Sequence, residues 1–236
     1  MVRLLVVVLL CMCVLAGCVV NLPFNNRLDY SKVSEAKRFT PANATPVAID
    51  WIPSTFPNRV DIQGASGFVG GGSQTRIPTG IALSNRIIEA LDVSVGIDAN
   101  SKNQLALHIL KAESKFEYSA GFANVTPGMD YGWCNLEVEF DFDGTVWKES
   151  FLAEEKDPTI GASSQTAILE RAWDNVAVQV AKNVAGKIAM APKNDNYKNS
   201  EQYLMKKKKI VDEMAKAEAE RMAREKEAQA LRERKY

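Results

Sequence analysis

Apolar and polar residues alternate most regularly between Trp133 and Ala153, where apolar side chains occupy every second position around Asp143-Gly144. A period of two residues is typical of a strand with one buried face. Asp-Gly between two such strands predicts a hairpin closed by a type I′ turn. The segment is therefore predicted to form two antiparallel strands.

The two-residue turn fixes which side chains face each other in this hairpin. The expected pairs are Phe140 with Trp147 and Phe142 with Thr145 on the buried face, and Glu139 with Lys148 on the solvent face. Glu149 would oppose Val138 on the apolar face, and this misfit predicts either a β-bulge or the rim of the core.

Two segments have the 3.6-residue period of amphipathic helices. Residues 79–93 carry an apolar stripe, and Thr79 can cap the first amides. Residues 163–190 repeat an apolar side chain at every fourth position from Ile168 to Ile188. At 1.5 Å per residue the second helix would be roughly 40 Å long, so we expect it to lie diagonally across a sheet.

Shorter β-type runs lie at residues 47–52 and 59–63, and a longer one at residues 104–119. Together the elements predict an α+β fold. We expect a mostly antiparallel sheet with the amphipathic helices 79–93 and 163–190 packed on one face.

The C-terminal residues 201–236 are highly charged, and they follow a linker at residues 191–200. They predict a solvated helix about 50 Å long. Lysine clusters attract anionic surfaces, and a helix without a core-facing stripe often has a partner. The candidate partner-binding residues are Lys206, Lys207, Lys208, Lys209, Ile210 and Met214.

The N-terminal residues form an apolar run from Leu4 to Val20 behind Arg3. The positive residue, the apolar run and the small residues near Gly17 predict a cleaved leader, residues 1–17. An uncleaved membrane anchor is the alternative interpretation, since 17 apolar residues reach the lower limit for crossing a bilayer. The following segment, residues 18–45, is rich in Asn, Ser and Pro and is predicted to be a tether to a domain at residues 46–190.

The sequence Leu15-Ala16-Gly17-Cys18 resembles a bacterial lipobox. The resemblance implies cleavage between Gly17 and Cys18, acyl chains such as palmitate on Cys18, and usually acylation of the freed amine. Two or three acyl chains hold a protein on a membrane almost permanently. Val19 rather than Asp follows Cys18, and in the enterobacterial sorting pattern this implies the periplasmic face of the outer membrane.

The element order over residues 46–190 resembles the YajG-type periplasmic lipoproteins and, more loosely, the auxiliary lipoproteins of ABC-type transport systems. These families imply no catalytic residues. The charged tail is not part of their pattern.

Charge is balanced overall but unevenly distributed. Residues 198–236 hold 12 Lys and Arg against 8 Asp and Glu, and the remainder holds 17 against 21. Neither part has the strong single-sign field of a nucleic-acid binder, so we expect no nucleic-acid partner.

Few residues offer chemistry. After the leader is removed and Cys18 is acylated, Cys134 is the only thiol and no internal disulfide is expected. The single histidine, His108, has no nearby ligand or base motif. The carboxylates Glu139, Asp141 and Asp143 with Gly144 imitate the start of a calcium loop, but Ser150 stands where a bidentate glutamate is needed. We therefore expect no enzyme activity, no cofactor and no metal.

The sequence leads to one main functional hypothesis and one alternative. The main hypothesis is a lipid-anchored, non-catalytic scaffold or accessory protein of a cell-envelope assembly, which binds an envelope protein through its C-terminal helix. The sequence does not determine whether the protein is a monomer or an oligomer. The alternative is a transport-auxiliary lipoprotein that binds a lipid-like ligand in a groove. The aromatic residues that would line this groove, or else fill the core, are Phe140, Phe142, Trp147 and Trp173.

Overall fold

The computed structural model describes residues 19–42, 44–64, 74–117, 128–158, 164–191 and 197–233. The predicted leader and the lipobox residues Gly17 and Cys18 lie outside the described residues.

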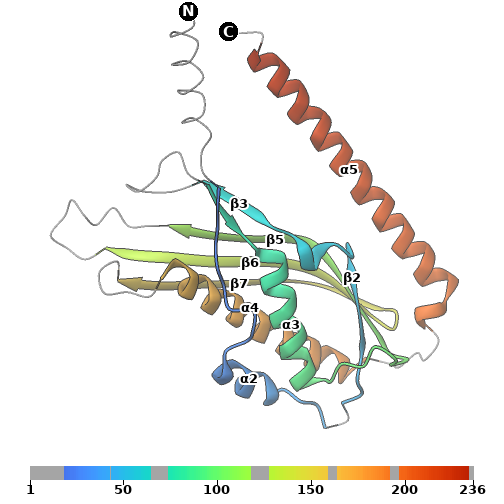
Figure 1. Cartoon of the computed structure of the whole chain (residues 1–236). Helices are drawn as coiled ribbons and strands as arrows, with labels where there is room; N and C mark the ends of the chain where they lie inside the picture. The colour runs from blue at the N-terminus through green and yellow to red at the C-terminus, as the bar shows by residue number, and fades with distance from the viewer. Residues whose placement is uncertain are drawn as a thin grey trace, which may run out of the picture.

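The main sheet has four strands in the order β2-β5-β6-β7, shown in Figure 1. Its strands are β2 (Ala48–Ile52), β5 (Gln104–Glu117), β6 (Met129–Phe142) and β7 (Thr145–Pro158). The edge strand β2 is parallel to β5, whereas β5, β6 and β7 are antiparallel. The predicted α+β class with a mostly antiparallel sheet is confirmed.

The β6–β7 hairpin has the predicted turn and register. Asp143 and Gly144 have φ values of +48° and +94°, and positive φ at both central positions is what a type I′ turn requires. The paired positions are Phe140 with Trp147, Phe142 with Thr145, Glu139 with Lys148, and Val138 with Glu149. Glu149 lies at the rim of the core, where its Oε2 accepts a hydrogen bond from Asn183 at 3.0 Å. The only register shift in the pairing of β5 with β6 falls between Ile109 and Lys111.

Helices α3 (Thr79–Ser94) and α4 (Gln165–Ile188) cover one face of this sheet, as predicted. The cap of α4 is the Ser164 side chain, which accepts a hydrogen bond from the Ala167 amide. Thr79 was expected to cap α3, and it does not. It is the first helical residue, after Pro78, and its buried Oγ1 has no hydrogen-bond partner within the described part of the chain.

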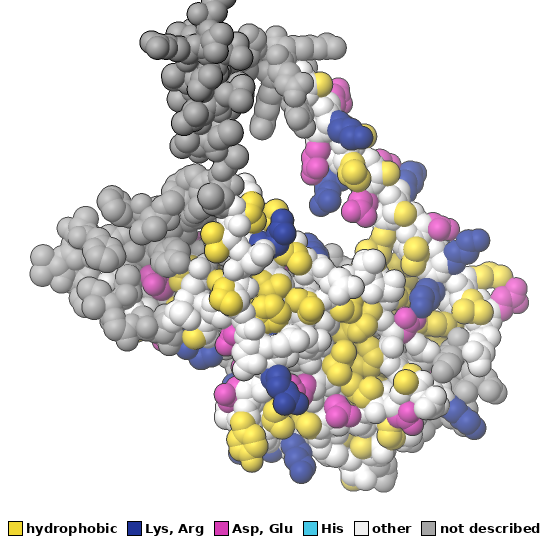
Figure 2. Space-filling view, in the orientation of Figure 1, with side chains coloured by type: hydrophobic (Ala, Val, Ile, Leu, Met, Phe, Trp, Pro, Cys, Tyr) yellow, Lys and Arg dark blue, Asp and Glu magenta, His cyan; other side chains and the backbone are white. Residues whose placement is uncertain are grey.

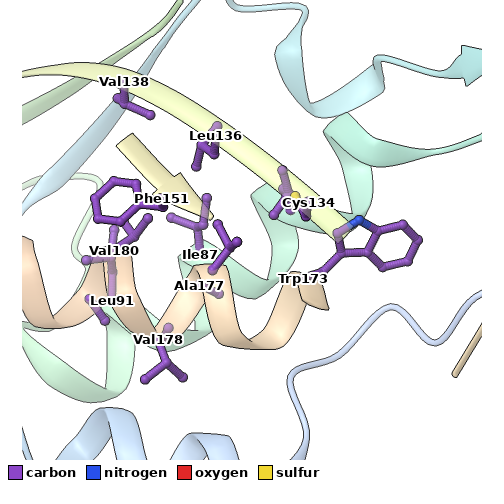
Figure 3. Packing of buried hydrophobic residues seen from close by; sticks show 14 of the residues in the cluster. Ile87, Leu91, Cys134, Leu136, Val138, Phe151, Trp173, Ala177, Val178 and Val180 are labelled. Carbon is purple, nitrogen blue, oxygen red and sulfur yellow. The ribbon is translucent and has the colours of Figure 1, made fainter. Parts of the chain in front are cut away.

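The core lies between this helical layer and the sheet. Alternate side chains of β6 point toward α4 and α3, as Figure 3 shows for Leu136 and Val138 opposite Val180 and Leu91. The predicted stripe of α4 is buried along its length, from Ile168 to Ile188. Burial of such a stripe stabilises the helix more than its intrinsic propensity does.

The segment expected to be a tether instead contains a strand and a helix that pack on the domain. β1 (Val19–Asn21) joins β3 (Asp61–Gly64) and β4 (Gln74–Ile77) in a small sheet of order β1-β4-β3, and α2 (Tyr30–Lys37) packs on α3 and α4. Three apolar side chains of this segment are buried, namely Leu22, Leu28 and Ala36. They are spaced too irregularly to form a periodic pattern, so each one docks separately onto the domain.

In this N-terminal region, hydrogen bonds between side chains and the backbone, rather than a periodic apolar stripe, determine where the chain folds. The Asp29 carboxylate accepts the Ser31 amide at 2.8 Å and so begins α2, and this hydrogen bonding lowers the pKa of Asp29. The Leu28 amide donates to the Glu89 carboxylate of α3 at 2.7 Å. These polar contacts fix the path of the chain between β1 and α2.

Helix α5 (Glu201–Glu233) follows the short 3₁₀ turn η2 (Tyr197–Asn199), and a second such turn, η1 (Phe56–Asn58), follows β2. α5 starts beside the β6–β7 turn and runs away from the domain, as Figure 1 shows in red. Among the described helices, none is both long and apolar enough to cross a membrane.

Candidate functional site: the base of the C-terminal helix

The face of the main sheet opposite α3 and α4 carries the residues on which α5 rests. They alternate with core residues such as Leu105, Leu107 and Phe140, so they point the other way. The residues on this outer face are Asp50 and Ile52 of β2, Ala106 and His108 of β5, and Glu139 and Asp141 of β6.

The contacting side of α5 is a short helical stripe. Its members recur three or four residues apart and are the buried or half-buried side chains of the helix, namely Tyr203, Lys206, Lys207, Ile210 and Met214. Tyr197 and Tyr203, with ring centroids 5.3 Å apart, form a small second core with Ile52 and Ala106. We call this contact region the α5 base.

Asp50 is the first of two carboxylates that hold the α5 base. It accepts a hydrogen bond from the Tyr203 hydroxyl and another from the Lys207 Nζ, each at 2.5 Å. Lys207 has a side-chain exposure of 36% and Asp50 of 19%, so this ion pair is only partly screened by solvent.

Asp141 is the second carboxylate. Its Oδ2 accepts from the Tyr197 hydroxyl at 2.9 Å and from Lys206 Nζ at 2.8 Å, while Oδ1 accepts the Gly144 amide at 3.1 Å. Lys206 also lies 3.5 Å from a carboxylate oxygen of Glu139. One carboxylate therefore joins the hairpin turn, the 3₁₀ turn η2 and α5.

Burial, and then hydrogen bonding to a carboxylate, raises the pKa of both tyrosines above their ordinary value. Tyr197 and Tyr203 therefore remain protonated donors at every physiological pH.

His108 lies beneath α5 rather than at an open surface. Its Nδ1 is buried and has no hydrogen-bond partner in the described residues, next to a cavity of about 10 Å³ that Ile52, Tyr203 and Ile210 also line. That volume is about the size of one water molecule. Burial lowers the pKa of His108, and the nearby Glu139 opposes the effect.

The predicted partner-binding residues divide into two groups. Lys206, Lys207, Ile210 and Met214 contact the chain's own sheet. Lys208 and Lys209 are exposed, and Lys209 lies 3.9 Å from Glu213 within the helix. Sequence analysis missed the two acceptors Asp50 and Asp141. The missed signal was the spacing of Tyr203, Ile210 and Met214 along one side of the helix, which indicates a helix that docks at one end.

Beyond Met214 the helix leaves the domain. Every side chain from Ala215 to Glu227 is exposed, and charges of both signs line this part in Figure 2. Four-apart pairs join Glu220 to Arg224 at 3.8 Å and Arg221 to Glu225 at 3.7 Å. Such pairs each contribute about 0.2–0.5 kcal/mol to a helix.

The remaining chemical candidates are parts of the packing. Cys134 is fully buried, burial raises the pKa of its thiol to about 12, and Ser114 is its hydrogen-bond partner. The calcium-like carboxylates do not converge, because Asp143 Oδ1 accepts the Gln104 amide at 2.9 Å and Asp141 binds α5. In the described ranges, no group of three metal-binding side chains is close enough to hold an ion.

The aromatic residues considered for a ligand groove lie in the core. Phe140 and Phe142 are fully buried, and Phe140 stacks on Trp147 with ring centroids 5.0 Å apart. Trp173 is also fully buried, and its indole N–H donates to the Ser114 hydroxyl at 2.8 Å. All four side chains belong to the core cluster or pack against it.

No family model and no curated protein matches this chain. Among solved structures it is similar to protein XCC0632 from Xanthomonas campestris, described with the family model DUF330, at 16% identity and a TM-score of 0.37 over 74% of this chain and 95% of that chain. It is also similar to a minor lipoprotein from Acinetobacter baumannii, at 12% identity and a TM-score of 0.29 over 63% of this chain and 90% of that chain. At these scores neither likeness bears on what the chain binds.

Proposed function

We propose that this chain is a lipid-anchored, non-catalytic accessory protein of the bacterial cell envelope that binds another envelope protein through the exposed part of α5. The lipobox-like Leu15-Ala16-Gly17-Cys18 supports the anchor. Val19 after Cys18 supports the periplasmic face of the outer membrane.

The change in α5 at Met214 carries the proposal. Before this residue the helix is held by the sheet through Asp50 and Asp141, and after it the side chains are exposed. A helix that is firmly held at one end and bare along the rest presents its free part at a fixed angle. Pre-organisation of this kind lowers the entropic cost of binding a partner.

An exposed apolar stripe also runs along α5, from its held part into its free part. Leu204, Val211 and Met222 are 55%, 45% and 49% exposed. Their separations of seven and eleven residues place them on one exposed side of the helix, next to the side that contacts the sheet. Apolar anchors along one side of a helix are the pattern by which helices bind in a groove of a partner protein.

A ligand-binding function is not proposed, because the aromatic residues that would line the groove are packed in the core. Catalysis is likewise not proposed. Cys134 is buried with a raised pKa, and His108 lies under the α5 base.

A photo-crosslinking amino acid at Met222 tests the proposal in intact cells that process lipoproteins. Val146, on β7, is the matched control because it is 47% exposed and lies outside α5. We expect a discrete crosslinked product from position 222 that is absent from position 146. A truncated chain ending at Met214, which keeps the α5 base, should lose the partner in co-purification.

Equal products from both positions, or no product from position 222, would contradict partner binding through α5. A product of twice the chain's mass would mean that the partner is a second copy of this chain.

A further inference from the structure

Four β-branched side chains are exposed on β1 and at β3. Val19 and Val20 of β1 are 45% and 55% exposed, and Val60 and Ile62 at β3 are 46% and 54% exposed. β1 and β3 both pair with β4, so these side chains belong to one small sheet. Val20 pairs with Thr75, as does Gln63, so it points to the other side, and we call Val19, Val60 and Ile62 the small-sheet patch.

The three members of the patch share one face of the small sheet. Val19 pairs with Gln74 and Ile62 pairs with Arg76, and positions two apart on β4 point the same way. Val60 lies two residues before Ile62 and shares its side. Figure 2 shows hydrophobic side chains over the corner of the molecule where Figure 1 labels β3.

This face is turned away from the main sheet. Gln63, the neighbour of Ile62, points the opposite way and bonds to the backbone of Phe116 in β5, whose amide donates to Gln63 Oε1 at 3.1 Å. Alternation along β3 therefore directs Ile62 outward. The described part of the main sheet therefore does not cover the patch.

The covalent path from the lipobox to the patch is one residue long. Val19 follows Cys18 directly, and consecutive Cα atoms are about 3.8 Å apart. The chain then stays on the small sheet, because the Leu22 amide donates to the Arg76 carbonyl at 3.1 Å. Acyl chains on Cys18 would hold this corner of the domain at the bilayer surface, without the flexible spacer that the sequence predicted.

We propose that the small-sheet patch lies against the lipid leaflet that holds the acyl chains of Cys18. This inference rests on the proposed lipid anchor. The β-branched side chains would enter the boundary between head groups and acyl chains. Arg76, exposed on the same face as Ile62, would face the lipid phosphates.

The size of the patch favours lipid over a protein partner. Three half-exposed side chains cover on the order of a few hundred Å², well below the roughly 1,000 Å² that a specific protein interface needs. Acyl chains supply nearly all of the membrane affinity. A small patch next to them is therefore sufficient to set the orientation of the domain.

Fluorescence quenching in vesicles tests the proposal with the full mature chain. Cys134 is buried and its thiol has a raised pKa, so Ile62→Cys offers one reactive thiol once Cys18 is acylated. Val146→Cys is the matched control, because Val146 is 47% exposed at the far end of the main sheet. Each labelled protein is reconstituted in phosphatidylethanolamine–phosphatidylglycerol vesicles with and without spin-labelled phospholipid.

We expect spin-labelled lipid to reduce the fluorescence at position 62 about twofold or more, and to leave position 146 unchanged, because an interfacial group lies within about 10 Å of the head groups. Intact mass of the same samples reports acylation of Cys18. Acylated protein without quenching at position 62 overturns this inference and leaves the anchor in place. Unacylated protein overturns the anchor and this inference together.

Discussion

Arg86 and Asp174 form a charge pair inside the helical layer. Arg86 Nε donates to Asp174 Oδ1 at 2.6 Å, the two side chains are 1% and 7% exposed, and the guanidinium lies 5.4 Å from the Trp173 ring. Burial raises the pKa of Asp174, and Arg86 opposes that shift. The pair joins α3 to α4 at the cost of removing both charges from water.

Asp174→Ala should therefore destabilise the protein by about 3–5 kcal/mol, because it leaves the Arg86 charge buried without its partner. The double variant Arg86→Met with Asp174→Leu should recover most of this loss, since no charge is then buried. Urea unfolding of the wild type and both variants measures the difference. A double variant no more stable than Asp174→Ala would show that the pair itself, rather than the stranded charge, stabilises the fold.

His108 gives the α5 base a defined pH dependence. Burial lowers its pKa from the ordinary 6.5, so the unfolded chain binds the proton more readily than the folded chain. The contribution of neutral His108 is thus complete above pH 6.5 and is lost as the pH falls through the folded-state pKa. The charged groups that act on it include Glu139, Lys148, Lys206 and Glu213, and Asp141 and Lys207 line the same cavity.

His108→Gln should accordingly lose less stability than the wild type when the pH falls from about 7 to about 5. Chemical unfolding at both pH values checks this. The comparison cancels the carboxylates that both proteins share. Equal losses in the two proteins would mean that His108 takes up its proton in the folded state without penalty.

The hairpin turn is an element that also supports the C-terminal segment. Gly144 has a φ of +94°, and a Cβ there would lie 3.2 Å from the Tyr197 ring. Gly144→Ala should destabilise the protein by about 1 kcal/mol or more, through backbone strain and displacement of Tyr197. Thermal unfolding measures it, and Gly186→Ala in α4, where a Cβ meets nothing within 4 Å, is the matched control. A loss no larger at Gly144 than at Gly186 would contradict the turn's role.

The α5 base should be separable from the exposed arm. A chain ending at Met214 keeps every contact of the base and should unfold within about 2 °C of the full chain, because exposed residues contribute little. A chain ending at Asn199 loses Tyr203 and uncovers Ile52 and Ala106. It should unfold at least 5 °C or so lower, at roughly 2–4 °C per kcal/mol for a chain of this size. Equal melting temperatures would show that α5 does not dock.

Local periodicity made the main elements predictable from the sequence. The hairpin register follows from Asp143-Gly144, and the helices α3 and α4 follow from apolar spacing that needs no distant information. The site was less predictable. Asp50 lies more than 150 positions from Tyr203 and Lys207, and a lysine that docks has the same sequence pattern as a lysine in water.

The N-terminal segment was missed for a related reason. Leu22, Leu28 and Ala36 each fill a separate site on the domain, so no window of sequence shows a repeat. Its polar composition is that of a linker, while its hydrogen bonds to Glu89 and Arg76 exist only in the folded chain. Composition therefore predicts a solvated segment, and it cannot reveal single residues that pack onto the domain.

At the scale of the whole molecule, the main sheet separates the two surfaces to which we assign proposed functions. α3 and α4 close the core on one face, and the α5 base occupies the other (Figure 1). The small sheet with β1 lies at the end of β5 around Phe116, whereas the α5 base lies at its beginning around Ala106. The proposed lipid contact and the proposed partner-binding arm therefore start from opposite ends of one rigid sheet.

This layout makes a specific prediction about coupling. Ile62→Asp should leave the crosslinked product from position 222 unchanged, because the two surfaces share no contact in the described chain. It should change the folding stability by no more than about 0.5 kcal/mol, since Ile62 is exposed. Crosslinking in cells and urea unfolding of the same variant measure the two quantities. Loss of the product with unchanged stability would mean that membrane contact positions the arm.

The anchor at Cys18 is the claim on which the proposed location and the lipid contact both depend. Intact-mass spectrometry of the protein isolated from the membranes of the cell that makes it tests this claim most directly. We predict a chain that begins at Cys18 and carries the mass of two or three acyl chains with their glycerol. A chain that retains residues 1–17, or one that begins at Cys18 without added mass, would contradict the account.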